Sequence, residues 1–315
     1  MTLDNILEEI KKANKIVILT HENPDGDAIG SSLGLSLALK QLDKNVDVII
    51  PEFPKIFDFL PDTENIKKES DEEVYDLAIA LDCSDIQRLN GFVKYFEDAK
   101  VKIVIDHHGK NKMFGDYNYV DPVAPACAQI LIAMLEYFNI DITKEIGTCL
   151  IAGIITDTGG FRYSGVTTET FEFASWILSK GINISEIYRK VLQTKTKTNF
   201  ELTKLAMERM EFLENEKISY TYITKEDEER IGTQHGDHEG LVEIGRDIEG
   251  VEVSIFIREA EKGYKVSLRS NEYVDVADVC FMFGGGGHLR AAGCTINGTL
   301  EQVKQKILTE LKARI

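Results

Sequence analysis

Short apolar runs alternate with helical patterns through the first third of the chain, and this alternation constrains the fold more than any other feature. The stretches between the runs, at residues 31–42, 53–60 and 86–96, carry apolar residues at helical spacing. Strands that alternate with helices predict a parallel sheet with helices on both faces, which is the α/β class. The strand candidates are residues 15–19, 46–50, 76–81 and 101–105.

A different pattern begins after residue 214. Residues 194–214 contain neither glycine nor proline and are polar on one side, so we predict a connecting helix there. Beyond it, several segments alternate like the strands of a smaller mixed sheet. A chain of 315 residues is longer than one core usually supports, so we expect two domains. The predicted division is a first domain at residues 1–193, a linker at 194–214 and a smaller α/β domain at 215–315.

Charge and apolar content narrow the classes of partner. The formal net charge of −17 argues against long duplex DNA, because lysine and arginine supply most of the affinity for a phosphate backbone. A small anionic substrate remains compatible if bound metal reverses the charge locally. No apolar run approaches the roughly 20 residues of a membrane span, and the acidic N-terminus is unlike a secretory signal. We therefore expect a cytoplasmic protein without a membrane partner. Its five cysteines lack CxxC spacing and are predicted to be buried thiols.

Acidic and imidazole side chains follow the predicted strands at the points where the strands end. His21, Asp25 and Asp27 lie within seven residues after the first run. Asp82 closes the third strand, and the sequence Asp106-His107-His108 follows the fourth. Residues 154–156 form a further apolar run that leads into Asp157. Each acid taken singly is equally compatible with a helix cap or a loop position, and each histidine with a hydrogen-bonded core residue.

The carboxyl ends of parallel strands meet at one edge of a sheet, where α/β proteins place their ligands. The candidates therefore converge on one crevice. Carboxylates gathered in this way repel one another and require about two divalent ions. Mixed imidazole and carboxylate ligands suit Mn, Fe, Co or Zn, and the lack of a thiolate argues against a structural zinc site. The predicted ligands are His21, Asp25, Asp27, Asp82, His107 and Asp157.

A run of four glycines near the end of the chain is a second candidate site. Backbone N–H groups of Gly285, Gly286 and Gly287 can approach an anion closely, and His288 can add a donor. Arg258 and Arg269, at the ends of two predicted strands, can supply guanidinium groups to a phosphate or a nucleobase. The alternatives are a plain flexible turn for the glycines and solvated strand positions for the arginines.

Three further residues are ambiguous. Arg88 can reach a phosphate, although a charge on a helix surface explains it equally well. His235 and His238 have metal-like spacing, but we interpret them as loop residues because the predicted ligand set is already complete.

With these motifs in this order, the sequence resembles the DHH phosphoesterase superfamily over nearly its whole length. That group includes RecJ-type nucleases, manganese inorganic pyrophosphatases and small oligoribonucleases. The residues from His21 to Asp27 resemble its first motif, and Asp82 lies in the second. Asp106-His107-His108 matches the third motif, and residues 157–164 match the fourth. Residues 284–293 are similar to the glycine-rich signature of the DHH-associated domain.

The resemblance implies a role for each candidate. It implies that His21 and Asp25 hold one ion, that Asp27, His107 and Asp157 hold the other, and that Asp82 bridges them. It further implies that His108 faces the substrate phosphate and that Asp106 holds the two histidines in place. The implied chemistry is two-metal hydrolysis of a phosphate ester, with Asp82 and His108 as the catalytic pair.

By the same resemblance, a chain of these two domains alone is most similar to stand-alone oligoribonucleases that also act on 3′-phosphoadenosine 5′-phosphate (pAp). We therefore expect a manganese-dependent phosphoesterase that cleaves short RNA oligomers and linear dinucleotides (pApA, pGpG) to mononucleotides, and pAp to AMP. The sequence is compatible with a homodimer and does not fix the oligomeric state. The alternatives are a cyclic dinucleotide phosphodiesterase and a catalytically inactive nucleotide sensor. An inorganic pyrophosphatase is disfavoured by the glycine-rich loop.

Overall fold

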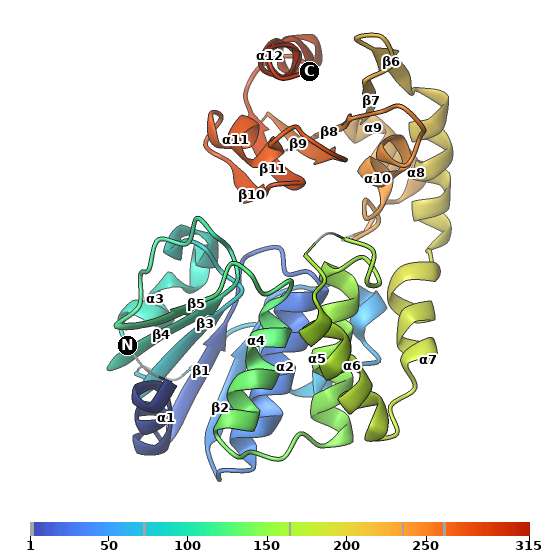
Figure 1. Cartoon of the computed structure of the whole chain (residues 1–315). Coiled ribbons are helices and arrows are strands. Elements are labelled where there is room, and N and C mark those ends of the chain that lie inside the picture. Colours follow the sequence, from blue (N-terminus) through green and yellow to red (C-terminus); the bar gives the residue numbers. More distant parts are fainter. Residues whose placement is uncertain (1–2, 72–73, 164, 235, 261–262) are drawn as a thin grey trace. The chain divides into compact units, whose positions relative to one another are not determined.

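The computed structural model describes residues 3–71, 74–163, 165–234, 236–260 and 263–315. The chain divides into two compact units, Met1–Thr194 and Lys195–Ile315. Each unit has its own sheet and its own hydrophobic core (Figure 1). No helix in the described ranges is long and apolar enough to cross a membrane.

The first unit is built on a five-stranded parallel sheet with the order β2-β1-β3-β4-β5. Every residue of β3 is buried, as expected for a strand covered on both faces. The fifth strand, β5, was not predicted from the sequence, because it is only four residues long and its residues are half-buried. The strands are β1 (Lys15–Leu19), β2 (Asn45–Ile49), β3 (Leu77–Leu81), β4 (Val101–Asp106) and β5 (Tyr117–Val120).

Helices cover both faces of this sheet, which confirms the predicted α/β class. One face packs against a large core to which α1, α2, α4 and α5 contribute (Figure 1). The other face packs against Leu89, Tyr95 and Phe96 of η3 and α3. The helices are α1 (Leu3–Lys12), α2 (Gly26–Lys40), α3 (Val93–Glu97), α4 (Cys127–Tyr137), α5 (Lys144–Asp157), α6 (Thr168–Ser179) and α7 (Ile184–Tyr188), with short helical turns η1 (Lys55–Phe57), η2 (Thr63–Asn65), η3 (Ile86–Phe92) and η4 (Arg189–Gln193).

Two local predictions for the first unit were wrong. Residues 154–156 are not a strand but the last turn of α5, whose residues from Ile146 to Ile155 are buried except Thr148. A short apolar run at the end of a buried helix cannot be told from a buried strand by periodicity alone. The helices predicted at residues 53–60 and 86–96 are mostly short 3₁₀ turns.

Helix α2 packs closely against α5 because three of its residues are glycines facing that helix. A Cβ on Gly30 would lie 2.4 Å from the carbonyl oxygen of Cys149, and one on Gly34 would lie 2.7 Å from a methyl group of Leu150. A Cβ on Gly26 would meet Thr156 in the same way. The close approach brings the start of α2 and the end of α5 together at one end of the helix pair.

The second unit contains a six-stranded mixed sheet with the order β10-β11-β9-β8-β7-β6, in which only β7 and β8 run parallel. This agrees with the smaller mixed-sheet domain expected from the sequence. Helices α11 and α12 pack on one face, and α8 and α10 on the other. The elements are α8 (Lys197–Glu208), β6 (Glu211–Leu213), β7 (Ile218–Ile223), α9 (Lys225–Ile231), α10 (Leu241–Arg246), β8 (Val253–Glu259), β9 (Tyr264–Ser270), α11 (Val276–Phe281), β10 (Gly286–His288), β11 (Ala291–Ile296) and α12 (Leu300–Lys312).

The predicted linker at residues 194–214 differs from the structure. Its helical part is α8, but Leu202 and Ala206 of this helix are buried against Ile223 and Phe256 of the second sheet. Its last residues form β6, which pairs with β7. Both parts therefore belong to the second unit, because α8 has a small apolar face that the polar composition of the segment conceals. All five cysteines are buried free thiols, as predicted.

Candidate active site

Asp25 and His21 lie in the turn that joins β1 to α2. Asp25 is the N-cap of α2, and its Oδ1 accepts hydrogen bonds from the N–H groups of Asp27 and Ala28 at 3.0 and 3.1 Å. Its other oxygen, Oδ2, lies 3.9 Å from Nε2 of the buried His21. The helix-cap interpretation of Asp25 and its place beside His21 are therefore compatible, because the two oxygens serve different purposes.

Asp27 is fully buried and is held by backbone N–H groups from another helix. Its carboxylate accepts hydrogen bonds from Cys127 N at 2.5 Å and Ala128 N at 2.9 Å, both in the first turn of α4. A helix N-terminus stabilises a negative charge in this way. Gly153 of α5 leaves room for the carboxylate, since a Cβ there would lie 2.7 Å from Asp27 Oδ1. None of these backbone contacts has a signature in the sequence.

Asp82 is the central carboxylate of the cluster. It follows β3 directly, has the left-handed φ of 51°, and is 2% exposed. Asp82 Oδ2 lies 3.8 Å from His21 Nε2, and Oδ1 lies 3.3 Å from His107 Nε2. Within the described part of the chain, Oδ1 receives no well-aligned hydrogen bond. Burial raises the pKa of Asp82 well above its ordinary value, and the charges of Asp25 and Asp27 raise it further.

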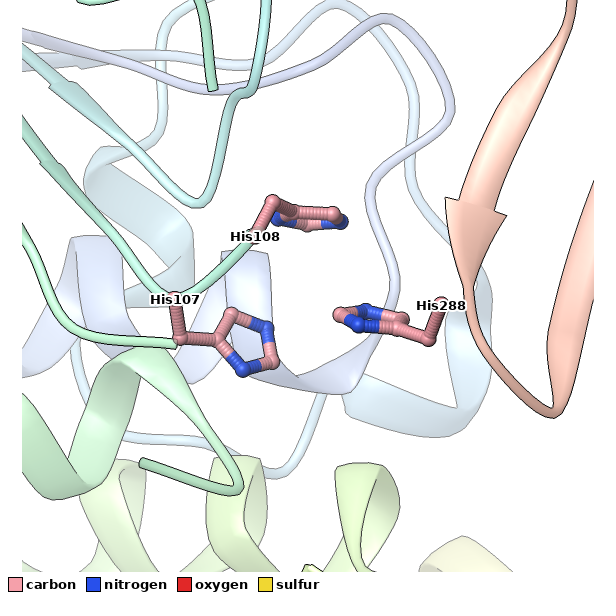
Figure 2. A group of neighbouring side chains, drawn as sticks. All are labelled: His107, His108 and His288. Carbon is pink, nitrogen blue, oxygen red and sulfur yellow. The ribbon is translucent and has the colours of Figure 1, made fainter. Parts of the chain in front are cut away.

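His107 and His108 follow β4, and their rings meet edge to face with the centroids 4.9 Å apart (Figure 2). The Nδ1 atom of His107 lies 3.2 Å from the carbonyl oxygen of Ala124, to which it can only donate. Its Nε2 is then directed toward carboxylates, 3.3 Å from Asp157 Oδ2 and 3.9 Å from Asp27 Oδ2. The third ring in Figure 2, His288, belongs to β10 of the second unit.

Asp106 orients both histidines through hydrogen bonds. Its Oδ1 accepts from the backbone N–H of His107 at 2.9 Å and lies 2.7 Å from His108 Nδ1. Its Oδ2 accepts from Asn111 Nδ2 at 2.6 Å. Burial opposes ionisation of Asp106, but the hydrogen bond and charge of His108 prevail and lower its pKa to about 2. Asn111 was missed in the sequence, although it lies only three residues after His108.

The pKa of His107 also departs from its ordinary value. Burial acts to lower it, but Asp82, Asp157 and Asp27 outweigh burial and raise the pKa of His107 well above normal. In the metal-free protein, the imidazolium is the counter-charge of the surrounding carboxylates. The pKa of His21 is instead lowered to about 4, chiefly by burial, so this ring is neutral near pH 7.

These residues fit divalent cations. Two ligands that each lie about 2.1 Å from one ion are about 3 to 3.5 Å apart, close to the 3.3 Å and 3.8 Å separations around Asp82. Ligand atoms of His21, Asp25 and Asp82 lie within 4.8 Å of one another, as do those of Asp27, Asp82 and His107. Asp82 is common to both groups. Among the described residues, Asp82 Oδ1 accepts no hydrogen bond, and this free oxygen together with the mixed nitrogen and oxygen ligands is typical of a site for transition-metal dications.

The substrate-binding candidates of the second unit are only partly brought together. Register places Arg269 of β9 opposite Ala291 of β11, which itself pairs with His288 of β10, so Arg269 and His288 share one row across the sheet. Arg258 pairs with Lys265, which lies four residues before Arg269 in β9. That offset corresponds to about 13 Å at 3.3 Å per residue. Arg258 therefore lies at the other end of the strands.

Both arginines have a glutamate partner that sequence reasoning missed. Arg269 Nε donates to Glu243 Oε1 of α10 at 2.8 Å, and Arg258 Nη1 lies 3.7 Å from Glu228 Oε1 of α9. His238 Nε2 lies 2.6 Å from the same Glu228 oxygen. Two residues considered in the sequence, His235 and Ser164 of the fourth motif, lie outside the described residues.

The glycine run differs from the open loop that we expected. Gly284 N and Gly285 N donate to carbonyl oxygens of α11, those of Phe281 and Cys280, so neither N–H is available to an anion. Gly286 and Gly287 belong to β10, which pairs with β11. Gly287 has a φ of 142°, which excludes other residues, and a Cβ there would lie 2.4 Å from Ala291 O. The glycines therefore permit close backbone packing.

Comparison with known proteins assigns the family. The model of the DHH family N-terminal domain matches residues 15–154, and that of the DHHA1 domain matches residues 215–315. The bifunctional oligoribonuclease and PAP phosphatase NrnA of Thermus thermophilus is 34% identical, over 98% of this chain and 94% of the relative. The chain belongs to the DHH family.

A further relative and two solved structures are also similar to this chain. The NrnA of Bacillus subtilis, also named a bifunctional oligoribonuclease and PAP phosphatase, is 25% identical over 92% of each chain. The crystal structure of an exopolyphosphatase-related protein from Bacteroides fragilis is 32% identical and has a TM-score of 0.90, with 99% of this chain and 95% of that chain covered. RecJ of Thermus thermophilus in complex with Mn²⁺ has a TM-score of 0.58 at 14% identity, and this likeness concerns the fold alone.

Proposed function

We propose that this DHH protein is a two-metal phosphoesterase that hydrolyses short oligoribonucleotides and linear dinucleotides to mononucleotides, and pAp to AMP. The observation that carries the proposal is Asp82, a buried carboxylate with His21 on one side and His107 on the other. The names of the full-length relatives support the choice of substrates, because each covers nearly the whole chain.

In this proposal, His21 and Asp25 hold one ion, Asp27, His107 and Asp157 hold the other, and Asp82 contributes to both. Divalent ions, when bound, supply Lewis acidity that lowers the pKa of water and offsets the charge of the phosphate. Manganese is our expectation for the ion, since imidazole and carboxylate ligands together suit it.

The chain itself supplies orientation and proton transfer. Asp27 is fixed by the N-terminus of α4, and the Ala124 carbonyl sets the tautomer of His107. Asp106 accepts from His108 Nδ1, so the opposite ring nitrogen, Nε2, can be presented to the substrate. From there His108 can donate a proton to the leaving alkoxide or a hydrogen bond to a phosphoryl oxygen.

The second unit is proposed to bind the nucleotide. Arg269 and His288 lie in one row across β9, β11 and β10, on the sheet face that also bears the small residues Ala291 and Gly293. Because Ala291 and Gly293 carry little or no side chain, a phosphate or the edge of a base can approach this face of the sheet. Arg258 is the weaker candidate, because it lies at the opposite end of the strands.

The experiment is turnover of purified protein on a ladder of substrates, with Mn²⁺, Mg²⁺, Co²⁺ and Zn²⁺ compared. The ladder contains pAp, pApA, pGpG, RNA of increasing length and a cyclic dinucleotide. We expect the dinucleotides and pAp to be hydrolysed fastest and Mn²⁺ to support the highest rate. Preference for long strands or for the cyclic dinucleotide would contradict the proposed substrates. Tight nucleotide binding without turnover with any ion would identify a sensor instead.

A further inference from the structure

Arg88 is held between the two loops that carry His21 and Asp82. It lies in η3, where its N–H donates to the carbonyl oxygen of Asp85 at 3.0 Å. Its own carbonyl oxygen accepts from the N–H of Glu22, the residue after His21, at 2.8 Å. The first bond belongs to the turn η3 itself, and the second joins this turn to the loop that carries His21. The side chain of Arg88 therefore starts from a defined position beside the cluster.

The carboxylates closest to Arg88 in the sequence are engaged by other groups. Asp85 accepts from Lys112 Nζ and from the N–H of Gln87. Glu22 Oε2 accepts from Asn90 Nδ2 at 2.7 Å. Among the residues that the structure describes, no side chain forms an ion pair or a hydrogen bond with the guanidinium of Arg88, although the residue is half-buried. Its five donors are therefore available to a ligand.

The positive charge of Arg88 belongs to a segment that borders the cluster. Arg88 lies six residues after Asp82, and its carbonyl oxygen accepts from the N–H of the residue that follows His21. A fixed positive charge beside a site that is rich in carboxylates favours one class of ligand, which is an anion that approaches the same site.

We propose that Arg88 binds a phosphate group of the nucleotide and is a substrate-positioning residue of the first unit. The inference rests on the proposed function for its substrates and adds a residue that neither the metal cluster nor the second unit supplies. A planar guanidinium matches two phosphate oxygens at once, which a lysine cannot do. An arginine that served only the solubility of the protein would have an exposed and mobile side chain. Arg88 is instead half-buried, and both its backbone N–H and its carbonyl oxygen form hydrogen bonds.

The test compares three variants of the full chain, each loaded with Mn²⁺. Arg88→Met removes the charge. Arg88→Lys keeps the charge but lacks the planar guanidinium group that can bind two oxygens at once. Lys144→Met is the control for net charge: Lys144 is exposed at the start of α5, thirteen residues before Asp157. That spacing places it about 20 Å from Asp157. KM and kcat are measured for pAp and pApA, and the affinities for AMP, inorganic phosphate and Mn²⁺ are measured by calorimetry.

We expect Arg88→Met to raise KM and to weaken AMP binding by roughly tenfold or more, with Mn²⁺ affinity changed less than about threefold. Arg88→Lys should recover part of the loss, and it replaces Arg88→Met if that variant does not fold. Lys144→Met should match the wild type. Equal KM and equal AMP affinity in Arg88→Met and Lys144→Met would overturn the inference, as would a loss of kcat alone. If the wild type hydrolyses none of the substrates, the proposed function fails, and the affinities for AMP and inorganic phosphate decide the role of Arg88 by themselves.

Discussion

The two units of the chain stabilise their charged side chains in different ways. In the first unit, Asp27 and Asp82 are buried at the ends of strands and helices, and backbone groups or imidazoles are their nearest partners. In the second unit, Arg258 and Arg269 are half-buried, and each lies beside a glutamate from a neighbouring helix. The first arrangement leaves negative charge in excess, whereas the second is close to neutral.

This difference has a physical consequence for binding. Buried carboxylates that outnumber their counter-charges are costly in the free protein, and a divalent cation relieves that cost when it binds. Arginines with glutamate partners cost the ligand-free protein little free energy, since the glutamate already offsets part of their charge. For the same reason, binding of an anion to them releases less free energy. Changes in the first unit should therefore affect metal binding and turnover strongly, and changes in the second unit should affect mainly the affinity for the nucleotide.

The largest effect is expected for Asp82→Asn. Turnover should fall by about a thousandfold or more, since the ligand common to both groups loses its charge. The metal-free variant should nevertheless be more stable than the wild type, by about 1 kcal/mol or more, because a buried carboxylate with a raised pKa becomes neutral. Asparagine also tolerates the left-handed backbone at this position. Steady-state kinetics and urea unfolding in a chelator measure the two effects.

Asp141→Asn is the matched control, because Asp141 is exposed in the segment just before α5. It should leave turnover unchanged. Normal turnover in Asp82→Asn would show that the cluster is not the reaction centre and would remove the contrast between the units.

The second prediction concerns the pH dependence of metal binding. The pKa values of Asp82 and His107 are raised in the metal-free protein, so protons bound there must leave when a cation binds. Affinity for Mn²⁺ should therefore fall as the pH is lowered from 8 to 6, by about tenfold per pH unit for each proton displaced. Calorimetry in two buffers with different ionisation enthalpies counts the protons released. A constant affinity over this range would contradict the excess of negative charge in the first unit.

The third prediction distinguishes the role of Arg269 in the second unit from that of its partner Glu243. Arg269→Met should raise KM for pAp by about tenfold without changing Mn²⁺ affinity, because a charge-assisted contact to phosphate is lost. Glu243→Gln should lower KM or leave it unchanged, since Arg269 then carries its full charge. Steady-state kinetics and Mn²⁺ calorimetry measure both variants. If Glu243→Gln raises KM as much as Arg269→Met does, the glutamate positions the arginine, and neutralisation is not its main role.

The smallest effect on turnover is expected for Asp227→Asn, which alters an ion pair at the Arg258 end of the second sheet, opposite to the end with Arg269 and His288. Asp227 Oδ2 lies 2.5 Å from Arg209 Nη1 and caps α9 through Thr224. The variant should lose about 1–3 kcal/mol of stability at pH 7 and keep its kcat at 25 °C. Burial opposes the shift, but Arg209 and Thr224 lower the pKa of Asp227 below its ordinary value. The stabilisation is therefore complete above the ordinary pKa near 3.8 and is lost as the pH falls through the lower folded value.

Urea unfolding at pH 7 and at pH 3 measures this difference between Asp227→Asn and the wild type. The gap in stability should narrow at the lower pH, because pH 3 lies below the ordinary pKa near 3.8, so the unfolded carboxyl takes up a proton while the folded one remains ionised. A gap that widens toward low pH would mean that Asp227 is not stabilised as the anion.

Much of the first sheet was predictable from the sequence, because each strand is a compact apolar run bounded by turn residues. The predicted strand at residues 15–19 has the bounds of β1, and those at 46–50, 76–81 and 101–105 differ from β2, β3 and β4 by a single residue at one or both ends. Strand β5 could not be predicted in this way, because its residues are only half-buried. Asp157 was expected at a strand end and is instead the last residue of a buried helix.

The second candidate site was less predictable. The glycine run was recognised, but its N–H groups at Gly284 and Gly285 are used within the fold, and Arg258 and Arg269 lie at opposite ends of their strands. Both facts depend on strand register and on helix ends, which local sequence does not specify. The partners Glu228 and Glu243 also come from helices far from the arginines in the chain.

The sequence by itself determined the chemistry of the first unit, because it contains the imidazole and carboxylate donors and the apolar strands that carry them to one edge. Only the tertiary structure decided how each donor is held, through Cys127 N, Ala128 N, Ala124 O and the room at Gly153. Every residue offers the same backbone N–H and C=O groups. Which of them meets a given carboxylate or imidazole is therefore set by the packing of helices and strands that are distant in the chain.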